Sequence, residues 1–232
     1  MSRPSSVVAA TCLCGSLSPE PVQCPDHKGI FKNGKRLISV GKIVGLLPQP
    51  PCNMCGAASY GEHERRSKDG KHCDVYEKIV NAQERGSQCD ELFSKWVIGK
   101  LTDIPKKTRH DVYDEIGGTG LLQKLMRWFN KQKFTKVESQ VVVGDDEVGG
   151  VLDLRFDGIV YELKSVYDVT SQHFIQCAGY SDLIDDNEFG VVLHVSERFP
   201  EPRLRMTNYE DLRDFRTLRA AYSVLVRRSG KD

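Results

Sequence analysis

The 232-residue sequence lacks any apolar run that approaches the ~18 residues needed to cross a lipid bilayer. Its N-terminal segment, MSRPSSVVAATCLCG, carries one basic residue and too short an apolar stretch for a secretory signal. Internal repeats and low-complexity tracts are also missing. These absences predict a globular cytoplasmic protein with no membrane partner, long enough to bury a sizeable core.

An excess of charge of one sign is missing too, because 33 Lys and Arg residues are balanced by 32 Asp and Glu residues. The formal net charge of +1 excludes a uniformly basic coat for nucleic acid, but it allows an enzyme with a local basic groove. The glycine-rich stretches DEIGGTG and GDDEVGG lack the GxxxxGK[ST] pattern of a nucleotide-binding loop. Without that motif the chain cannot fuel its own movement along a nucleic acid.

Cysteine is present, with eight residues, but it is unevenly distributed. Cys89 and Cys177 stand alone and are expected to be small core residues, whereas the others lie in the first third of the chain among histidines. Clustered thiols beside imidazoles, in a chain without a secretory signal, favour structural zinc over disulfides. One predicted zinc site consists of Cys12, Cys14, Cys24 and His27, and a second candidate set consists of Cys52, Cys55, Cys73 and either His63 or His72. The sequence leaves open whether these form two sites or one, and free thiols are the alternative.

The composition of the chain changes at about residue 75. Residues 1–75 form a predicted Cys/His-rich N-terminal appendage, irregular over 1–36 and with an apolar segment, LISVGKIVGLLPQPP, after it. Residues 76–232 have the composition of an ordinary globular domain. Apolar periodicity there predicts helices over 75–101 (broken or bent near Gly86), 120–132, 171–186 and 209–228, and strands over 136–144, 151–156, 159–166 and 189–197. This order predicts an α/β (α+β) fold with a mixed central sheet flanked by helices.

Basic residues that suit a DNA groove occur in three places, although a solvated surface is the default for each taken singly. They are Lys28, Lys32, Lys35 and Arg36; Lys124, Arg127, Lys131, Lys133 and Lys136; and Arg213, Arg216, Arg219, Arg227 and Arg228 in the last helix. The opposite face of that helix is predicted to be apolar and to consist of Leu212, Phe215, Leu218, Tyr222 and Leu225.

The dipeptide Asp157-Gly158 is the strongest hairpin signal in the sequence. A two-residue turn at this point pairs Phe156 with Ile159 and, further along, Asp153 with Glu162. Alternation then places Asp153, Glu162 and Lys164 on one face and Leu152, Leu154, Tyr161 and Leu163 on the other. The two carboxylates therefore face each other with Cβ atoms ~5 Å apart, which destabilises a sheet unless a cation lies between them.

Two carboxylates with waters and a substrate phosphate form the oxygen-rich ligand set that Mg²⁺ or Mn²⁺ prefers. Lys164 adds a cation that can orient or activate a water, or stabilise a pentavalent phosphate. Gly149-Gly150 leaves room for a substrate backbone, and the next helix aligns Gln172, Gln176 and Tyr180 at four-residue spacing. The alternative for the same residues is a half-exposed hairpin whose charged face is simply solvated.

Three motifs, Gly150-x-x-Asp153, Glu162-Leu163-Lys164 and Gln176-x-x-x-Tyr180, together resemble the PD-(D/E)xK nuclease superfamily. Within it, the chain is similar to the RecB-like exonucleases of recombination systems and phages. The resemblance spans about residues 76–200, and RLISVGKIVGLL is similar to a segment that often opens the phage nucleases. It implies a restriction-endonuclease-like αβββαβ core.

By this resemblance, Asp153, Glu162 and the backbone carbonyl of Leu163 would bind a catalytic Mg²⁺ or Mn²⁺, and Lys164 would be the catalytic lysine. Gln176 and Tyr180 would contact DNA near the scissile phosphate, although burial against the sheet is the alternative for Tyr180. Glu138 matches an acidic residue that often supports the metal site.

Residues 85–90, RGSQCD, resemble the family's RG[ST]xxH helix, whose histidine can bind a metal. Arg85 would then belong to the DNA-binding residues, and Asp90 stands where the family has histidine. An oxygen ligand remains compatible with Mg²⁺ or Mn²⁺, but this departure puts a second metal ion in doubt. A helix-surface carboxylate is the alternative for Asp90, and similarly for Glu138. An iron–sulfur cluster is not expected, because its cysteines would follow the QxxxY helix and none occurs after Cys177.

The resemblance implies a metal-dependent DNA exonuclease of phage-type recombination, repair or DNA processing, phage-encoded in a bacterial host or otherwise intracellular. Its partners would be DNA and a recombination or single-strand-binding protein. One alternative is a structure-specific or restriction-type endonuclease of the same fold. Another is a non-catalytic, zinc-dependent DNA-binding or adaptor module whose acidic hairpin is inert.

Overall fold

The computed structural model describes residues 18–24, 29–47, 62, 74–105, 108, 112–184 and 189–229. The strands are β1 (Val22–Cys24), β2 (Gly29–Lys32), β3 (Lys35–Arg36), β4 (Ile38–Ser39), β5 (Val137–Gly144), β6 (Val148–Phe156), β7 (Ile159–Lys164), β8 (Val191–His194) and β9 (Arg203–Met206). The helices are α1 (Val40–Val44), α3 (Asp74–Val97), α4 (Leu121–Lys131), α5 (Ser171–Asp182) and α6 (Tyr209–Ser229). Within the described ranges, no helix is both long and apolar enough to pass through a membrane.

The core is a six-stranded mixed sheet in the order β4-β6-β7-β8-β9, with β5 added by pairing with β6. β4 and β8 run parallel to their neighbours β6 and β7, and the other pairs are antiparallel. β5 follows one edge of β6, and the opposite edge is shared by β4, which pairs at 148–149, and β7, which pairs at 154–156. Between these two pairings, residues 150–153 have no strand partner on that edge in the described part of the chain. The sheet therefore opens at this point.

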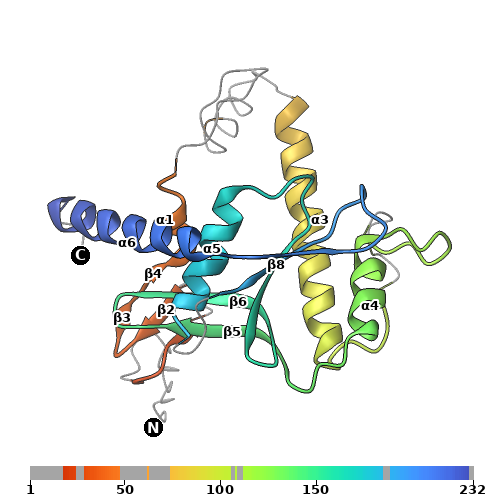
Figure 1. Ribbon diagram of the computed structural model, residues 1–232, viewed down its shortest axis with the longest axis horizontal. Helices are drawn as coiled ribbons and strands as arrows, with labels where there is room; N and C mark the ends of the chain where they lie inside the picture. Colours follow the sequence, from red (N-terminus) through yellow and green to blue (C-terminus); the bar gives the residue numbers. More distant parts are fainter. Residues whose placement is uncertain are drawn as a thin grey trace, which may run out of the picture.

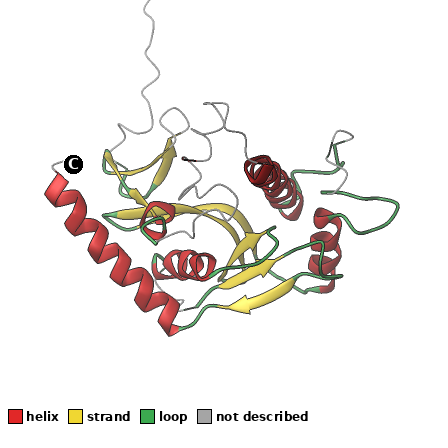
Figure 2. Ribbon diagram, turned by 90° about the horizontal axis from the view of Figure 1, so that it is seen from above, coloured by secondary structure: helices red, strands yellow, loops and turns green. Residues whose placement is uncertain are grey.

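Helices cover both faces of the sheet (Figures 1 and 2). On one face α3 and α4 bury a cluster that includes Phe93, Leu125 and Phe156, with the Phe134 and Phe156 rings stacked at 4.5 Å between centroids. On the other face α1, α5 and α6 bury a second cluster that includes Ile43 and Phe215. This arrangement confirms the predicted mixed sheet flanked by helices.

The N-terminal part of the chain is more regular than its composition predicts. β1, β2 and β3 form a three-stranded antiparallel sheet within the segment predicted to be irregular. The apolar segment after it provides β4, in which Ile38 pairs with Val148, and α1, whose residues Val40 and Ile43 are fully buried. Residues 38–44 thus belong to the core, upstream of the boundary that composition places near residue 75.

The helix α3 runs without interruption from Asp74 to Val97, so a break near Gly86, one of the two predicted forms, is absent. A Cβ atom at Gly86 would lie 2.8 Å from the hydroxyl oxygen of Ser165, just after β7. The glycine therefore allows close approach of α3 to the end of β7, and this packing explains a residue that helix propensity alone disfavours.

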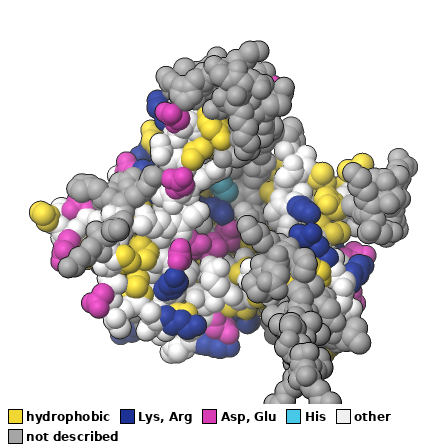
Figure 3. All heavy atoms as spheres, turned by 180° about the vertical axis from the view of Figure 1, so that it is seen from behind, with side chains coloured by type: hydrophobic (Ala, Val, Ile, Leu, Met, Phe, Trp, Pro, Cys, Tyr) yellow, Lys and Arg dark blue, Asp and Glu magenta, His cyan; other side chains and the backbone are white. Residues whose placement is uncertain are grey.

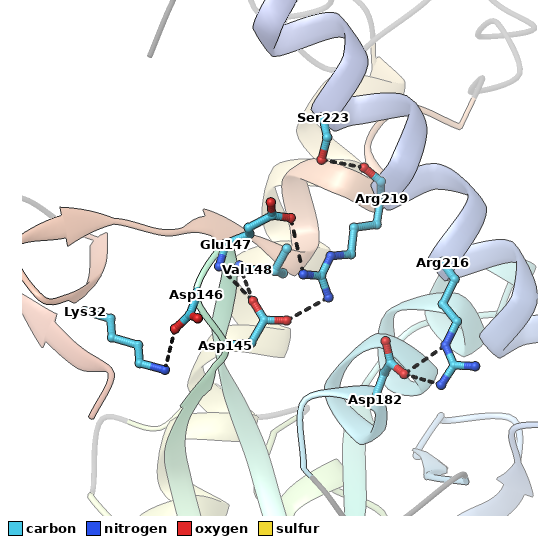
Figure 4. Close-up of polar contacts among 9 residues, drawn as sticks. All are labelled: Lys32, Asp145, Asp146, Glu147, Val148, Asp182, Arg216, Arg219 and Ser223. Carbon is cyan, nitrogen blue, oxygen red and sulfur yellow. Dashed lines mark hydrogen bonds and ion pairs between the residues drawn. The ribbon is translucent and has the colours of Figure 1, made fainter. Parts of the chain in front are cut away.

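The helix α6 lies across α5 with its first half and extends beyond the sheet with its second half (Figure 1). Of its predicted apolar face, Leu212 and Phe215 are buried, but Leu225 is 55% exposed. Ion pairs hold the helix to the domain: Arg216 contacts Asp182 of α5 at 2.7 Å, and Arg219 contacts Asp145 of the β5–β6 turn at 2.7 Å (Figure 4). These two arginines have a structural role, in contrast to the free basic surface that the sequence suggests.

Candidate active site

The hairpin between β6 and β7 has the predicted turn. Asp157 and Gly158 both have positive φ, 48° and 89°, as a two-residue type I′ turn requires. The register pairs Phe156 with Ile159 and Leu154 with Tyr161, as the sequence predicts. The Asp157 carboxylate also accepts hydrogen bonds from the backbone N–H groups of residues 135 and 136, which fixes the turn against the start of β5.

The backbone pairing of the hairpin stops where Asp153 and Glu162 were expected to pair. Here the backbone N–H of Leu163 donates to Oδ2 of Asp153 at 2.9 Å, so a side-chain oxygen takes the position of a strand acceptor. On the other side of β6, the ladder with β5 also skips Asp153, opposite Gln140, which has a φ of 52°. The two strands diverge from this point, and the Asp153 carboxylate lies in the opening.

The predicted faces of the hairpin are partly confirmed. Leu154, Tyr161 and Leu163 pack together in the cluster under α3 and α4. Leu152, predicted on that face, instead joins the cluster under α1, α5 and α6. The assignment of Leu152 was wrong because the ladder with β5 is interrupted at Asp153, and the regular alternation does not continue across this break from residue 154 to residue 152.

Glu162 and Lys164 form an enclosed ion pair next to Asp153. The Lys164 Nζ lies 2.7 Å from Oε1 of Glu162, and the two side chains are 18% and 2% exposed, respectively. When both carboxylates are ionised, the other carboxylate oxygen of Glu162, Oε2, is buried and has no hydrogen-bond partner among the described residues. When Asp153 holds its proton, the two carboxyl groups are hydrogen-bonded to each other. A buried, unpaired carboxylate oxygen is costly in a folded protein, and a bound cation would compensate it.

The protonation of this cluster is perturbed by burial and by mutual repulsion. Burial and the Glu162 charge raise the pKa of Asp153 to about 8, and burial also raises the pKa of Glu162. The Lys164 pKa is raised as well, because attraction by Glu162 and Asp153 outweighs the effect of burial. Strongly shifted pKa values among convergent titratable groups are typical of functional sites.

The helix α3 brings a third carboxylate toward the pair. Burial and the charge of Asp153 raise the pKa of Asp90 to about 7, and the Ser94 hydroxyl donates to Asp90 at 3.3 Å. Asp90 is therefore near the cluster, in contrast to a helix-surface carboxylate in bulk water. Glu138 of β5 lies beside two cations instead, 3.4 Å from Lys136 and 3.8 Å from Arg155.

Arg85 of α3 is placed by an ion pair, because its guanidinium lies 2.6 Å from Glu197 in the segment after β8. Its predicted contact with DNA, like the metal-ligand roles of Asp90 and Glu138, stays a prediction.

The helix α5 contributes Gln176 and Tyr180, whose side chains are hydrogen-bonded to each other. Tyr180 is buried, and burial raises the pKa of its hydroxyl. A Cβ atom at Gly150 would lie 2.3 Å from the Tyr180 ring, so the ring occupies the end of the opening at Gly150. The space that the sequence assigned to a substrate at Gly150 is therefore taken by Tyr180. DNA contact by either α5 residue remains a prediction.

Two histidines near Lys164 were not singled out by the sequence. His194 is the register partner of Lys164 on β8, is 3% exposed, and lies with Nε2 2.8 Å from the Val166 carbonyl oxygen. The Nδ1 atom of His173 accepts a hydrogen bond from the Thr170 N–H at the start of α5, at 3.0 Å. Burial and the Lys164 charge lower the pKa of His173 to about 4, so it is neutral at pH 7. His173 thus caps the start of α5 together with Thr170. The spacing Thr170-x-x-His173 at the start of the predicted helix is the one sequence signal for this capping role.

The basic residues of α4 are less available than their sequence suggests. Lys124 is 4% exposed, and its amine donates to the backbone carbonyl oxygens of residues 196, 197 and 199 at 3.0, 3.4 and 2.7 Å. Arg127 donates to the Gly118 carbonyl oxygen, and Lys131 pairs with Glu201. Lys124 in particular is a structural residue of the segment after β8 and was wrongly grouped with the DNA groove.

Most of the predicted zinc ligands lie outside the described residues: Cys12, Cys14, His27, Cys52, Cys55, His63, His72 and Cys73. Cys24 is described and is fully buried in β1, where it pairs with Gly29. Among the described residues, no three His, Cys, Asp or Glu side chains converge closely enough to hold a metal ion by themselves. The zinc site stays a prediction.

The residues of the opening fit a hard divalent cation. Mg²⁺ commonly binds to one or two carboxylates and completes its shell with waters and substrate phosphate, so two protein carboxylates suffice. Asp153 and Glu162 supply that number, and the unpaired Oε2 of Glu162 is an available ligand atom. Figure 3 shows one face of the molecule on which acidic side chains gather near the middle, beside a histidine and a basic side chain.

Comparison with known proteins gives no assignment by family. No protein-family model matches the chain, and no curated protein matches it. Among solved structures, the chain is similar to a protein of Eubacterium rectale named "Putative exonuclease", with a TM-score of 0.48 and 11% sequence identity over 84% of this chain and 82% of that chain. A similarity of this degree is too low to assign a function.

Proposed function

We propose that this protein is a metal-dependent phosphodiester hydrolase that acts on DNA, as an exonuclease of a recombination or DNA-processing system. The observation that supports this proposal is the enclosed cluster of Asp153, Glu162 and Lys164 at the opening of the sheet. Two buried carboxylates with raised pKa values and an unpaired oxygen are costly to the fold, and a divalent cation would offset this cost.

Asp153 and Glu162 would hold Mg²⁺ or Mn²⁺, with the Leu163 carbonyl as a further ligand and Asp90 and Glu138 as candidates for outer positions. The ion would supply charge neutralisation on the phosphate and a more acidic bound water. Asp153 is held in place for this role by the Leu163 N–H, and Glu162 by the Lys164 amine. Both carboxylates are thus oriented before any substrate binds.

Lys164 would act as a cationic hydrogen-bond donor. Its raised pKa keeps the amine protonated at neutral pH, which disfavours a role as general base. A protonated amine beside the two carboxylates can orient the attacking water or stabilise negative charge on a phosphate oxygen. Among the roles that the sequence suggested for this lysine, orientation of the water and stabilisation of the phosphate are therefore favoured over activation of the water.

The test is degradation of end-labelled linear DNA by the full-length protein with Mg²⁺ or Mn²⁺. We expect Asp153→Asn and Lys164→Ala each to reduce the rate by at least about a hundredfold. Asp146→Asn is the matched control, because this carboxylate on the β5–β6 turn is 88% exposed and its change should leave the rate unaltered. Full activity of Asp153→Asn would refute the proposal, and cleavage of closed circular DNA would reassign the enzyme as an endonuclease.

A structural zinc site in the N-terminal part is a separate proposal. Cys24 would contribute a thiolate, with Cys12, Cys14 and His27 as the other ligands and the later Cys/His set as a second site. Metal analysis of the purified protein should find at least one zinc per chain, and Cys24→Ser should reduce the zinc content. Binding of DNA without metal-dependent cleavage would instead favour a non-catalytic, zinc-dependent DNA-binding or adaptor module.

A further inference from the structure

A row of polar side chains leads from Lys164 across the sheet to its edge. Lys164 is the register partner of His194 on β8, and His194 is the partner of Arg203 on β9. Residues in register on adjacent strands share a face, and strands are ~4.8 Å apart. Arg203 therefore begins only ~10 Å from the candidate catalytic lysine, and Arg205 lies further along the same strand.

The surface at this edge is hollowed. A hollow of about 430 Å³ is lined by His194, Phe199, Arg203 and Arg205, together with Asp168 and Val169 from the segment between β7 and α5. We refer to it as the β9 hollow. Its lining includes His194 and Arg203 of the row that starts at Lys164, and it lies against β9, all four residues of which are solvent-exposed.

Aromatic rings and guanidinium groups alternate from the lining of the β9 hollow, at Phe199 and Arg203, to Arg198 and Tyr167, which are the chain neighbours of lining residues Phe199 and Asp168. The Arg198 guanidinium lies 4.3 Å from the centroid of the Tyr167 ring, and that of Arg203 lies 3.5 Å from the centroid of the Phe199 ring. Arg198 also lies 5.8 Å from the Phe199 ring, which joins the two pairs into one series. Tyr167 is 70% exposed, so most of its ring is open to a ligand.

The charge of the β9 hollow is positive. Asp168 forms an ion pair with Arg198 at 2.8 Å, which neutralises the acid of the lining. The guanidinium groups of Arg203 and Arg205 make no ion pair or hydrogen bond with any described residue, and each lies near an aromatic ring, that of Arg205 at 5.3 Å from the centroid of the Phe174 ring. Two guanidinium groups that have no counterion among the described residues and lie beside aromatic rings form a site for an anionic ligand with planar groups.

We infer that the β9 hollow binds a single-stranded segment of DNA, with phosphates on Arg203 and Arg205 and a base stacked on Tyr167. This inference rests on the proposed function, because it assigns the segment to the strand whose phosphodiester lies at Lys164. An unpaired base has a free π-face for stacking, whereas a base in a duplex does not. The enzyme would therefore require an unpaired strand next to the bond that it cleaves.

The test is binding of a fluorescent oligothymidylate to the full-length protein, measured by anisotropy without added Mg²⁺ or Mn²⁺, so that the strand stays intact. Tyr167→Ala should weaken binding by about fivefold or more, the range found for loss of one stacking contact. The double change Arg203→Ala and Arg205→Ala should weaken binding more at low salt than at high salt. It should also reduce the slope of log affinity against log salt by about 1.4, since single strands contribute ~0.7 per phosphate contact.

Two control variants match the test residues in ring or charge and in exposure. Tyr209→Ala removes a tyrosine that is 67% exposed at the start of α6, and Lys100→Ala removes an exposed cation in the segment after α3. Neither should change the affinity. An oligomer of abasic sites keeps the phosphates but lacks the bases, so it separates stacking from charge. Tyr167→Ala should not change the affinity for this oligomer, whereas the double change at Arg203 and Arg205 should still weaken binding. Thermal unfolding of each variant verifies that these surface changes leave the fold intact.

The inference is overturned if Tyr167→Ala binds like Tyr209→Ala, or if it affects the abasic oligomer equally. Unchanged DNA binding by all the variants would also overturn it and would leave the surface to a protein partner. Failure of the proposed function looks different, because it shows as absence of cleavage with Mg²⁺ or Mn²⁺ while the binding results stand. Cleavage that is retained with binding unaffected by the variants refutes the β9 hollow alone.

Discussion

The Leu163 backbone N–H donates a hydrogen bond to the Asp153 carboxylate across the β6–β7 hairpin, at 2.9 Å. This bond takes the place of a backbone hydrogen bond between the two strands. Asp153 therefore both interrupts the pairing of β6 with β7 and places its carboxylate in the resulting opening. The neighbouring Glu162 is then enclosed with one oxygen on Lys164 and the other unpaired. The site is thus built into the sheet and does not depend on a mobile loop.

The first prediction concerns the cost of this cluster to the fold. Asp153 has a pKa of about 8 in the native state, above the ordinary value of ~3.9 of an unfolded chain. Between these values the native state binds more protons, so the stability of the protein without divalent metal falls as the pH rises from about 4 to about 8. Asp153→Asn should therefore be more stable than the wild type at pH 8.5, by at least about 1.4 kcal/mol.

Urea unfolding at several pH values, without added divalent metal, measures this effect. The difference between Asp153→Asn and wild type should shrink toward zero near pH 3, below the ordinary pKa of ~3.9, where the carboxyl is protonated in both states. Asparagine retains an oxygen that can accept from Leu163, so the bond across the hairpin is kept. A stability difference that does not change with pH would contradict the assignment.

A second prediction concerns Lys124, which holds the segment after β8 by three carbonyl contacts. Lys124→Met fills a similar volume but leaves these carbonyl groups without their donor. We expect a loss of about 2–3 kcal/mol in the free energy of unfolding. Lys131→Met, at a side chain that is 60% exposed, should change it by less than about 0.5 kcal/mol. Equal effects of the two changes would show that Lys124 is not a structural residue.

A third prediction concerns the contact between Gly150 and Tyr180. Gly150→Ala would place a Cβ atom 2.3 Å from the ring, which must move, and we expect a loss of about 1–3 kcal/mol. Gly41→Ala is the control, because a Cβ atom at that position in α1 meets nothing within 4 Å. A smaller side chain in Tyr180→Leu should restore part of the loss in the double variant. The contact is disproved if Gly150→Ala unfolds like the control.

The sequence predicts the hairpin and the main helices and strands of the core well, because their signals are local. Asp157-Gly158 sets the turn and the register, and the predicted apolar stripe of Leu121, Leu122, Leu125, Met126 and Phe129 defines α4, in which Trp128 is also buried. From that register, the sequence also places Asp153, Glu162 and Lys164 together. The chemistry of the site is thus readable from one dipeptide and the alternation around it.

The features that the sequence did not predict depend on contacts between segments far apart in the chain. β9 is exposed along its whole length, so it has no alternation to mark it as a strand. Gly150 and Gly86 have no local signal for the ring and the hydroxyl that lie against them. Lys124 is basic in the sequence and buried in the structure because carbonyl groups some 70 residues away surround its amine. Such contacts are set by tertiary packing and not by local pattern.

The most direct test of the metal site is Mn²⁺ binding, followed by electron paramagnetic resonance on the full-length protein at pH 6.5 and pH 8.5. Because Asp153 and Glu162 must lose their protons to bind a metal, the wild type should bind Mn²⁺ at least about tenfold more tightly at pH 8.5. At that pH, Asp153→Asn should lose at least about tenfold in affinity, whereas Asp146→Asn should bind as the wild type does. Equal Mn²⁺ binding by the wild type and Asp153→Asn would contradict the assignment of Asp153 as a metal ligand.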